Sequence, residues 1–374
     1  MISDSFKGTL SSLDICQIAR ETFAQVAPEC ELVTIPVADG GEGTVDCFVQ
    51  AMNAIPVTVT VQGPFGDPVE AVYARMGDAA VIEMAAAAGL NLAGERKDPS
   101  KASTYGVGEL MRHAVEHGCQ EIFLGIGGSA TNDGGCGCAA ALGVRFSDET
   151  GAAFLPTGGT LDRIRTVDTA SARLLLKDIP LRVMCDVTNP LYGPNGAAYV
   201  FGPQKGADPA MVERLDGQLK AFAGTLQRGL GADVSALPGA GAAGGMGAGC
   251  VALLGGKLSS GIDAVLSAVG FEEQLKDADM VISGEGRLDS QSFQGKVISG
   301  IARRTGEAGV PLVILAGSID DSARDAAKHG ITAVFNTNRA ARPMSEVPAH
   351  CREDYCAALT DLLCTIRMAE DFKR

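Results

Sequence analysis

The residues best suited to chemistry in this sequence lie in three short loops that carry both charge and glycine. The loops read DSFKGT, ADGGEGT and GEGRLDSQS, and each follows an apolar run. They contribute two cations, Lys7 and Arg287, which could hold an anion. They also contribute acids, among them Asp39 and Asp289, and a carboxylate can accept a proton during catalysis. One acid at a strand end says little, but three such loops are hard to explain as scaffold.

A fourth loop is rich in glycine and follows the apolar run EIFLG. It reads IGGSATNDGGCGC and contains Gly127, Gly128, Ser129, Asn132 and Asp133. Successive backbone N–H groups in such a loop can point at one anion, which favours a phosphate cradle. Two alternatives stay open: a GxGxxA dinucleotide unit, and a tight turn that binds nothing. The dinucleotide unit is disfavoured because its helix would contain three glycines. Each glycine in a helix interior costs about 1 kcal/mol relative to alanine.

Two further stretches could serve the same chemistry. PGAGAAGGMGAG, with Gly244 and Gly245, offers a second loop without obstructing side chains, or else a glycine-lined helix contact. CDVTNPL places Asp186 at the end of an apolar run. The chain lacks the GxxxxGK[ST] and HRD or DFG motifs, so a phosphotransferase here would be neither a P-loop enzyme nor a protein kinase.

Composition excludes several classes of protein. The net charge of −14, without a basic cluster, argues against nucleic-acid binding. No apolar run approaches the ~18 residues of a membrane span, and the N-terminal residues given do not have a signal-peptide pattern. The 11 cysteines form no CxxC pair, and the CxC of Cys136 and Cys138 has no nearby partners for zinc. We therefore expect a cytoplasmic protein with free thiols and no membrane or nucleic-acid partner.

The loops must be positioned by strands and helices, and both ends of the chain alternate between the two. The pattern predicts helices over 10–27, 44–54, 297–307 and 353–370, and strands over 32–37, 280–283, VPLVILAGS and ITAVFN. This order is typical of a parallel sheet, and about five strands match a flavodoxin-like α/β domain.

The middle of the chain has a different pattern. PVTVTVQGPFGDPVEAVYARM alternates as a hairpin does, and further strands and a helix over 105–118 follow it. We interpret this part as a second α/β domain inserted into the first, which gives domain segments 1–55, 56–256 and 257–374. An insertion predicts a ligand cleft between the two domains.

Six motifs have the order and spacing found in bacterial type I glycerate kinases, so the chain resembles this family over essentially its whole length. They are DSFKGTLSS, PVADGGEGTVD, GIGGSATNDGG, CDVTNPL with GAAYVFGPQKGA, GAGAAGGMGAG, and GEGRLDSQS with a later GK. The resemblance implies phosphorylation of D-glycerate by ATP with Mg²⁺, and it looks like the branch that forms 2-phosphoglycerate. It also implies a flavodoxin-like domain with an inserted α/β domain, which agrees with the pattern of elements.

With this resemblance, each motif receives an expected role. The residues expected to hold ATP are Gly127, Gly128, Ser129, Asn132, Gly244 and Gly245. Asp133 is expected to bind Mg²⁺ through water, which Mg²⁺ prefers to keep. Asp186 is the first choice for the base that accepts the hydroxyl proton, and Asp289 is the second.

The glycerate itself is expected to bind to Lys7, Arg287 and Asp39, with the arginine holding the carboxylate bidentately. Two alternatives from other classes stay open: a nicotinamide-dependent oxidoreductase acting on a small hydroxy acid, and a non-enzymatic sugar-acid binding protein.

The chain departs from the family pattern at two places. Val297 and Ile298 follow the GK where proline is common, and only 1–3 precede DSFKG where the family usually has a full apolar strand. A central strand must satisfy backbone groups on both sides, and strands typically run ~5–6 residues. We therefore expect the natural protein to carry a few more apolar residues upstream.

Overall fold

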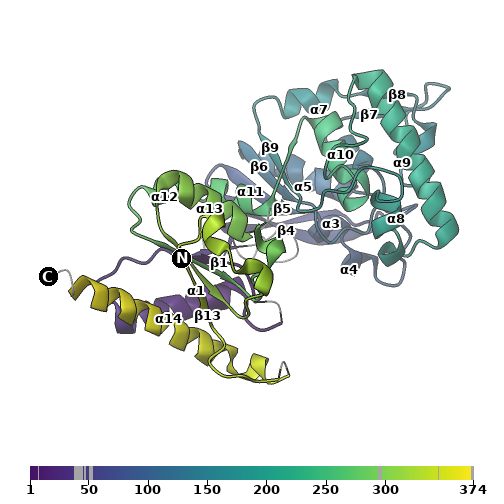
Figure 1. Ribbon diagram of the computed structural model, residues 1–374. Helices are drawn as coiled ribbons and strands as arrows, with labels where there is room; N and C mark the ends of the chain where they lie inside the picture. The colour runs from purple at the N-terminus through teal and green to yellow at the C-terminus, as the bar shows by residue number, and fades with distance from the viewer. Residues whose placement is uncertain are drawn as a thin grey trace. The chain divides into compact units, whose positions relative to one another are not determined.

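The computed structural model describes residues 1–6, 8–37, 45, 48–49, 54–293, 297–343 and 345–371. The chain forms two compact units, shown in Figure 1. The first unit comprises Met1–Ala38 and Val265–Arg374, and the second comprises Asp39–Ala264. The predicted boundaries at 55/56 and 256/257 both lie inside the second unit.

The first unit alternates strands and helices. Its elements are β1 (Ile2–Ser3), α1 (Ser12–Val26), β2 (Ile35–Pro36), α12 (Phe271–Leu275), β11 (Val281–Glu285), η3 (Ser290–Phe293), α13 (Val297–Ala308), β12 (Leu312–Ala316), η4 (Asp321–Ala323), η5 (Ala326–His329), β13 (Ala333–Asn336) and α14 (Val347–Asp371). The helix α11 (Gly261–Ala268) spans the boundary between the two units.

The strands of the first unit run parallel. β1 pairs with β2, and β11, β12 and β13 form a second ladder in that order. The backbone N–H of Asp4 donates to the carbonyl of Gly284 over 2.9 Å, which places β1 beside β11. The resulting order, 2-1-3-4-5 in the numbering of this unit's strands, is the flavodoxin-like order. The predicted fold class is confirmed.

The short central strand is held by side chains as well as by its ladder. The hydroxyl of Ser12, at the start of α1, donates to the Ser3 carbonyl over 2.6 Å and accepts the Val37 N–H over 2.8 Å. Helix α1 begins with a capping box between Ser11 and Asp14. Its apolar face packs beside α14, and the two helices run next to each other in Figure 1.

The strand predicted over 32–37 is shorter in the structure. Only Ile35 and Pro36 are in β2, because β1 offers just Ile2 and Ser3 as ladder partners. The other predicted strands and helices of this unit are present with shifts of a few residues. The helix predicted over 44–54 falls mostly outside the described residues.

The second unit contains the larger sheet. Its elements are β3 (Ile55–Gln62), β4 (Pro68–Met76), β5 (Ala79–Glu83), α3 (Ala85–Ala88), α4 (Leu90–Ala93), α5 (Tyr105–Glu116), β6 (Glu121–Gly125), α6 (Cys136–Ala141), β7 (Arg145–Ser147), η1 (Leu161–Arg163), β8 (Thr166–Asp168), α7 (Ala170–Leu175), β9 (Leu181–Met184), α8 (Ala197–Phe201), η2 (Pro203–Lys205), α9 (Pro209–Leu230), α10 (Ala242–Leu254) and β10 (Lys257–Ser259).

Six of these strands form one sheet in the order β10-β9-β6-β5-β4-β3. The predicted hairpin is confirmed: β3 and β4 pair antiparallel, from Ile55 opposite Arg75 to Gln62 opposite Pro68. From β5 to β10 the strands are parallel. β7 and β8 form a separate antiparallel pair. The carboxyl ends of β6 and β9 therefore meet at one edge of the sheet.

One continuous apolar core fills the second unit around β6, α5, α6 and α10. Cys136 and Cys138 belong to it, and burial raises their thiol pKa values well above the ordinary range. Within the part of the chain that the structure describes, no group of acids, histidines and cysteines could hold a metal ion. The described helices include none with the length and apolar character needed to cross a membrane.

Candidate active site

A cavity of about 230 Å³ lies in the second unit where β6 and β9 end. The two strands are adjacent and parallel, with Gly125 opposite Met184, so the loops that follow them share one edge of the sheet. The lining residues are Ile126, Gly127, Gly128, Ser129, Met184, Cys185, Asp186, Val187, Phe201, Gln204, Lys205, Ala242 and Ala243. Three predicted nucleotide-binding residues and the predicted base thus line one cavity.

The glycine loop after β6 is fixed by backbone pairing with residues 88–90. The Gly128 carbonyl accepts the Leu90 N–H, and the Ala130 N–H donates to the Ala88 carbonyl, both over 2.9 Å. Gly128 has a φ of +70°, a conformation that favours glycine. The loop is thus a defined turn that presents Gly127, Gly128 and Ser129 to the cavity.

Asp186 follows β9 and is anchored at one oxygen. Its Oδ1 accepts the backbone N–H of Gly261, the first residue of α11, over 2.8 Å. A helix N-terminus favours a negative charge, and this contact orients the carboxylate. The residue is exposed and lines the cavity, which suits a group that exchanges a proton with a ligand.

Lys205 also lines the cavity, and it has an unusual environment. Its side chain is 2% exposed, and Nζ donates to Ser129 Oγ over 2.8 Å and to the Thr131 carbonyl over 2.7 Å. Burial lowers the pKa of this ammonium to about 7, while the charge of Asp133 acts in the opposite direction. Sequence reasoning assigned Lys205 no role, although it is the charged residue of the motif FGPQKGA.

Asp133 is buried and hydrogen-bonded within the protein, and it is not exposed to this cavity or to solvent. It is fully buried, and its carboxylate accepts hydrogen bonds from the N–H and hydroxyl of Thr104, both over 2.8 Å. The N–H groups of Gly135 and Gly137 donate to it over 3.1 and 3.2 Å. Burial raises the pKa of this carboxyl, and these hydrogen bonds oppose that effect. The geometry gives no support to the predicted magnesium role.

The second glycine stretch, around Gly244, packs against the first. The Gly134 N–H donates to the Gly244 carbonyl over 3.0 Å, and a Cβ on Gly244 would lie 2.1 Å from the Thr131 carbonyl oxygen. A Cβ on Gly245 would lie 3.0 Å from Gly134 Cα. Both glycines are buried. Close backbone packing, the alternative left open for this motif, accounts for them.

In the first unit, Arg287 and Asp289 lie in the loop after β11. The Arg287 guanidinium is paired with Asp320 over 2.7 Å and lies 3.8 Å from an oxygen of Asp289. Hydrogen bonds from Ser322, with the pairing to Arg287, lower the pKa of Asp320 to about 2. The Arg287 side chain is 64% exposed. Lys7 and Asp39 lie outside the described residues.

Comparisons with known proteins identify this architecture. A family model described as the glycerate kinase family matches residues 1–367. The chain belongs to the glycerate kinase family.

Individual relatives agree with this membership over nearly the full length. The chain is 46% identical over 336 residues to a glycerate kinase of Halalkalibacterium halodurans, covering 89% of this chain and 88% of the relative. It is 42% identical over 366 residues to glycerate 2-kinase of Escherichia coli K12, covering 97% and 96%. The crystal structure of a protein described as glycerate kinase 2 from Salmonella typhimurium LT2 has a TM-score of 0.85 at 40% identity, covering 99% and 98%. The oxidoreductase and binding-protein alternatives are not supported.

Asn132 is a predicted nucleotide-binding residue whose surroundings in this glycerate kinase family member stand out. It is fully buried, and neither its amide nitrogen nor its amide oxygen has a hydrogen-bond partner among the described residues. The hydroxyl of the neighbouring Thr131 is in the same situation. Buried polar groups without partners typically cost about 1–3 kcal/mol each. Thr131 and Asn132 thus carry buried polar atoms that the hydrogen bonds of the fold do not use, next to the Thr131 carbonyl that accepts from Lys205.

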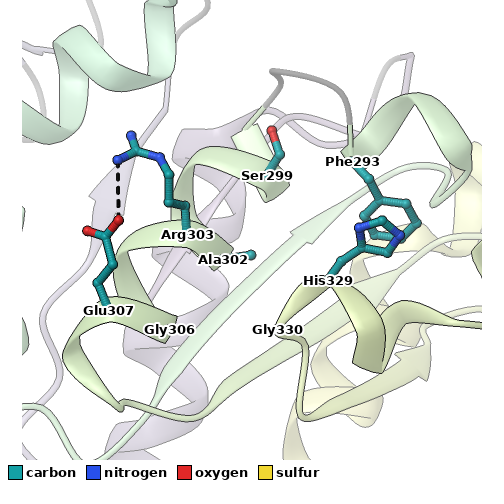
Figure 2. Close-up of a pocket in the computed structure, with 8 residues that line it drawn as sticks. All are labelled: Phe293, Ser299, Ala302, Arg303, Gly306, Glu307, His329 and Gly330. Atoms are coloured by element: carbon teal, nitrogen blue, oxygen red, sulfur yellow. Dashed lines mark ion pairs between the residues drawn. The ribbon is translucent and has the colours of Figure 1, made fainter.

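A second cavity, of about 490 Å³, lies in the first unit beside α13. Phe293 and His329 stack on one side of it with ring centroids 4.1 Å apart, and Arg303 pairs with Glu307 over 3.8 Å on the other, as Figure 2 shows. Its described lining contains Gly306 and Gly330 but no run of glycines, and Arg303 and Glu307 are largely exposed. The candidate active site is therefore the cavity at the ends of β6 and β9.

The close approach of the two glycine stretches can be tested with Gly244→Ala. Its φ is +67°, and a Cβ would collide with the Thr131 carbonyl, so the free energy of unfolding should fall by roughly 2–5 kcal/mol. Gly217→Ala is the matched control, because Gly217 is exposed in α9 with open space around it. That variant should gain about 0.5–1 kcal/mol. Equal denaturation midpoints for both variants would contradict the packing role.

The burial of Lys205 predicts a pH-dependent stability difference between the native protein and Lys205→Met. The folded pKa of about 7 lies below the unfolded value of 10.5, so the native protein gains stability as pH rises above 7. Lys205→Met lacks this gain, so its stability relative to native should improve by up to about 3 kcal/mol from pH 9 to pH 6. Denaturant titrations at both pH values measure it. A pH-independent difference would show that Lys205 is not desolvated.

Proposed function

We propose that this protein is an ATP-dependent kinase of D-glycerate that forms 2-phosphoglycerate. The observation that carries the proposal is the cavity at the ends of β6 and β9, where a glycine turn, an exposed carboxylate and a buried lysine meet. Phosphoryl transfer needs these features: backbone donors and a cation for phosphate, and a carboxylate for the hydroxyl proton. Membership of the glycerate kinase family and the identity to glycerate 2-kinase of Escherichia coli support the choice of acceptor and product.

In the proposed reaction, Asp186 accepts the proton of the glycerate 2-hydroxyl. The hydroxyl oxygen forms its bond to the terminal phosphorus of ATP while the bond from phosphorus to the leaving ADP oxygen breaks. The hydrogen bond from Gly261 keeps the carboxylate oriented throughout. Asp289 remains the second candidate, since the Gln291 N–H and the nearby Arg287 hold its carboxylate in place.

The nucleotide is proposed to bind through its phosphates to the turn of Gly127, Gly128 and Ser129. Mg²⁺ arrives with ATP as part of the substrate, and it tends to keep waters and phosphate oxygens as ligands. Arg287 is proposed to bind the glycerate carboxylate, with Lys7 and Asp39 as further contacts. The ten described cysteines are all free, which is consistent with the cytoplasm as the proposed location.

The proposed function is tested by incubating the protein with ATP, Mg²⁺ and D-glycerate. ADP should form only when all three are present, and ³¹P NMR of the product should show 2-phosphoglycerate. L-Glycerate and lactate serve as control acceptors. Formation of 3-phosphoglycerate would overturn the proposed product, and absence of ADP would overturn the proposed function.

The assignment of the base is tested by Asp186→Asn. The amide keeps an acceptor for the Gly261 N–H but is a far weaker base, so kcat should fall by roughly 10²–10⁴ with little change in the KM for ATP. Asp289→Asn should have a smaller effect on kcat. If Asp289→Asn abolishes turnover while Asp186→Asn retains it, Asp289 is the base.

The role of Arg287 is tested by Arg287→Lys. Lysine keeps the charge but loses the planar fork that binds a carboxylate at two points, so the KM for glycerate should rise several-fold. The KM for ATP should stay near the native value. A raised KM for ATP with an unchanged KM for glycerate would move Arg287 to the phosphates.

A further inference from the structure

A fully buried lysine with only neutral partners is rare. Lysine is almost never fully buried unless it is paired, because removing an ammonium from water is costly. Lys205 Nζ has two acceptors, the Ser129 hydroxyl and the Thr131 carbonyl, and among the described residues no carboxylate forms an ion pair with it. An ammonium has three donors. When it is protonated, Lys205 therefore has one donor more than these two acceptors use.

Lys205 lines the cavity together with Ser129, the residue whose hydroxyl accepts from its Nζ. Asp186 and Cys185 are the titratable groups that line the cavity with Lys205, and the charge of Asp133 acts on it from within the protein. Of these, Asp133 already accepts four hydrogen bonds, and Asp186 is bound at Oδ1 by Gly261. A ligand that enters the cavity can complete the coordination of Nζ.

The size and chemistry of the cavity limit that ligand to a small oxyanion. Pockets for drug-sized ligands usually span about 300–1,000 Å³, so the 230 Å³ here suits part of a nucleotide or a molecule as small as glycerate. Planar carboxylates favour the fork of arginine, whereas lysine acts as a compact point charge and is a common phosphate ligand. The turn of Gly127 and Gly128 beside Lys205 adds an anion-binding backbone.

A strained backbone lies at the same wall. Ala243 has a φ of +53°, and it is the one described residue other than glycine with a positive φ. Such a conformation costs of order 1–3 kcal/mol and is found preferentially at functional sites. A buried lysine and a strained alanine thus line one small cavity. Two such unfavourable features at one wall are expected where a ligand supplies the compensation.

We propose that Lys205 is the cation that contacts the phosphoryl group during its transfer from the nucleotide, and that Ser129 positions its Nζ. The inference rests on the proposed function for the identity of the nucleotide, but the phosphate contact can be tested separately. Lys205 would stabilise the charge that the phosphoryl oxygens carry in the transition state. Lys205 would then contribute the cation that the P-loop lysine contributes in P-loop enzymes, because this sequence has no GxxxxGK[ST] motif.

Phosphate binding should also change the protonation of Lys205. In the free protein the pKa of about 7 leaves this amine mostly neutral at pH 8. The negative charge of a bound phosphate favours the ammonium form, so binding at pH 8 should take up close to one proton. A purely structural lysine would show no such uptake.

The experiment compares the native protein with Lys205→Met, Lys205→Arg, Ser129→Ala and the control Lys220→Met, an exposed lysine of α9. Calorimetry at pH 8 in two buffers of different ionisation enthalpy measures the affinity for inorganic pyrophosphate, the affinity for D-glycerate and the proton uptake. Circular dichroism and thermal melts confirm that each variant is folded. Kinetics with ATP and D-glycerate follow on the same samples.

Lys205→Met should weaken pyrophosphate binding at least tenfold, abolish the proton uptake, and lower kcat by roughly 10²–10³. Its affinity for D-glycerate should stay within about threefold of native, and Lys205→Arg should recover part of the pyrophosphate affinity. Ser129→Ala should lower kcat less than Lys205→Met does. Lys220→Met should match the native protein in every measurement.

Two results would overturn the inference. Loss of D-glycerate affinity with unchanged pyrophosphate binding would make Lys205 a carboxylate ligand. Unchanged affinities, proton uptake and kcat in folded Lys205→Met would leave it no part in either site. Native protein that binds pyrophosphate through Lys205 but forms no ADP with glycerate would contradict the proposed function alone.

Discussion

The fully buried carboxylate of Asp133 is the interaction on which the active-site cavity depends. Its two oxygens accept four hydrogen bonds, from Thr104 at the start of α5 and from Gly135 and Gly137 at the start of α6. A buried charge without partners would be strongly unfavourable. The start of α5, the start of α6 and the loop that carries Asp133 must therefore stay together. The loop that carries Asp133 also carries Ser129 and Thr131, and both accept hydrogen bonds from Lys205 Nζ. The hydrogen bonds of a buried carboxyl group thereby hold in place the loop that binds Lys205.

The same region shows why the chain is so rich in glycine. Helices α5 and α6 approach so closely that a Cβ on Gly108 would lie 2.3 Å from the Cys138 carbonyl oxygen. Helix α10 makes a similar approach, because a Cβ on its Gly249 would lie 2.2 Å from the Gly134 carbonyl oxygen. Glycine costs backbone entropy on folding, and here the loss is offset by backbone packing that no other residue allows. Several glycines that resemble a ligand-binding loop in sequence thus bring two backbone segments together instead.

Two features that weaken the fold lie at the wall of the cavity. Lys205 is a buried lysine without an ion-pair partner among the described residues, and Ala243 has a strained backbone. By contrast, α9 and β12 follow the expected local rules: Asp208 and Pro209 begin α9, Gly231 ends it, and apolar β12 is buried along its whole length. Natural proteins usually break such rules at functional sites, which agrees with the function proposed for this cavity.

The sequence by itself determined the elements, the fold class and the family. Alternation of apolar runs and helical spacing depends on local backbone geometry, and six motifs in one order are specific. Asp186 and the turn of Gly127 and Gly128 were also predictable, because the ends of parallel strands meet at one edge of a sheet. Only the tertiary structure decided the environments of Asp133, Gly244 and Lys205. Residues distant in sequence decide whether a carboxylate is exposed or buried. They also decide whether a glycine faces a ligand or another backbone segment, and whether a lysine has an ion-pair partner. Those contacts exist only once the chain has folded.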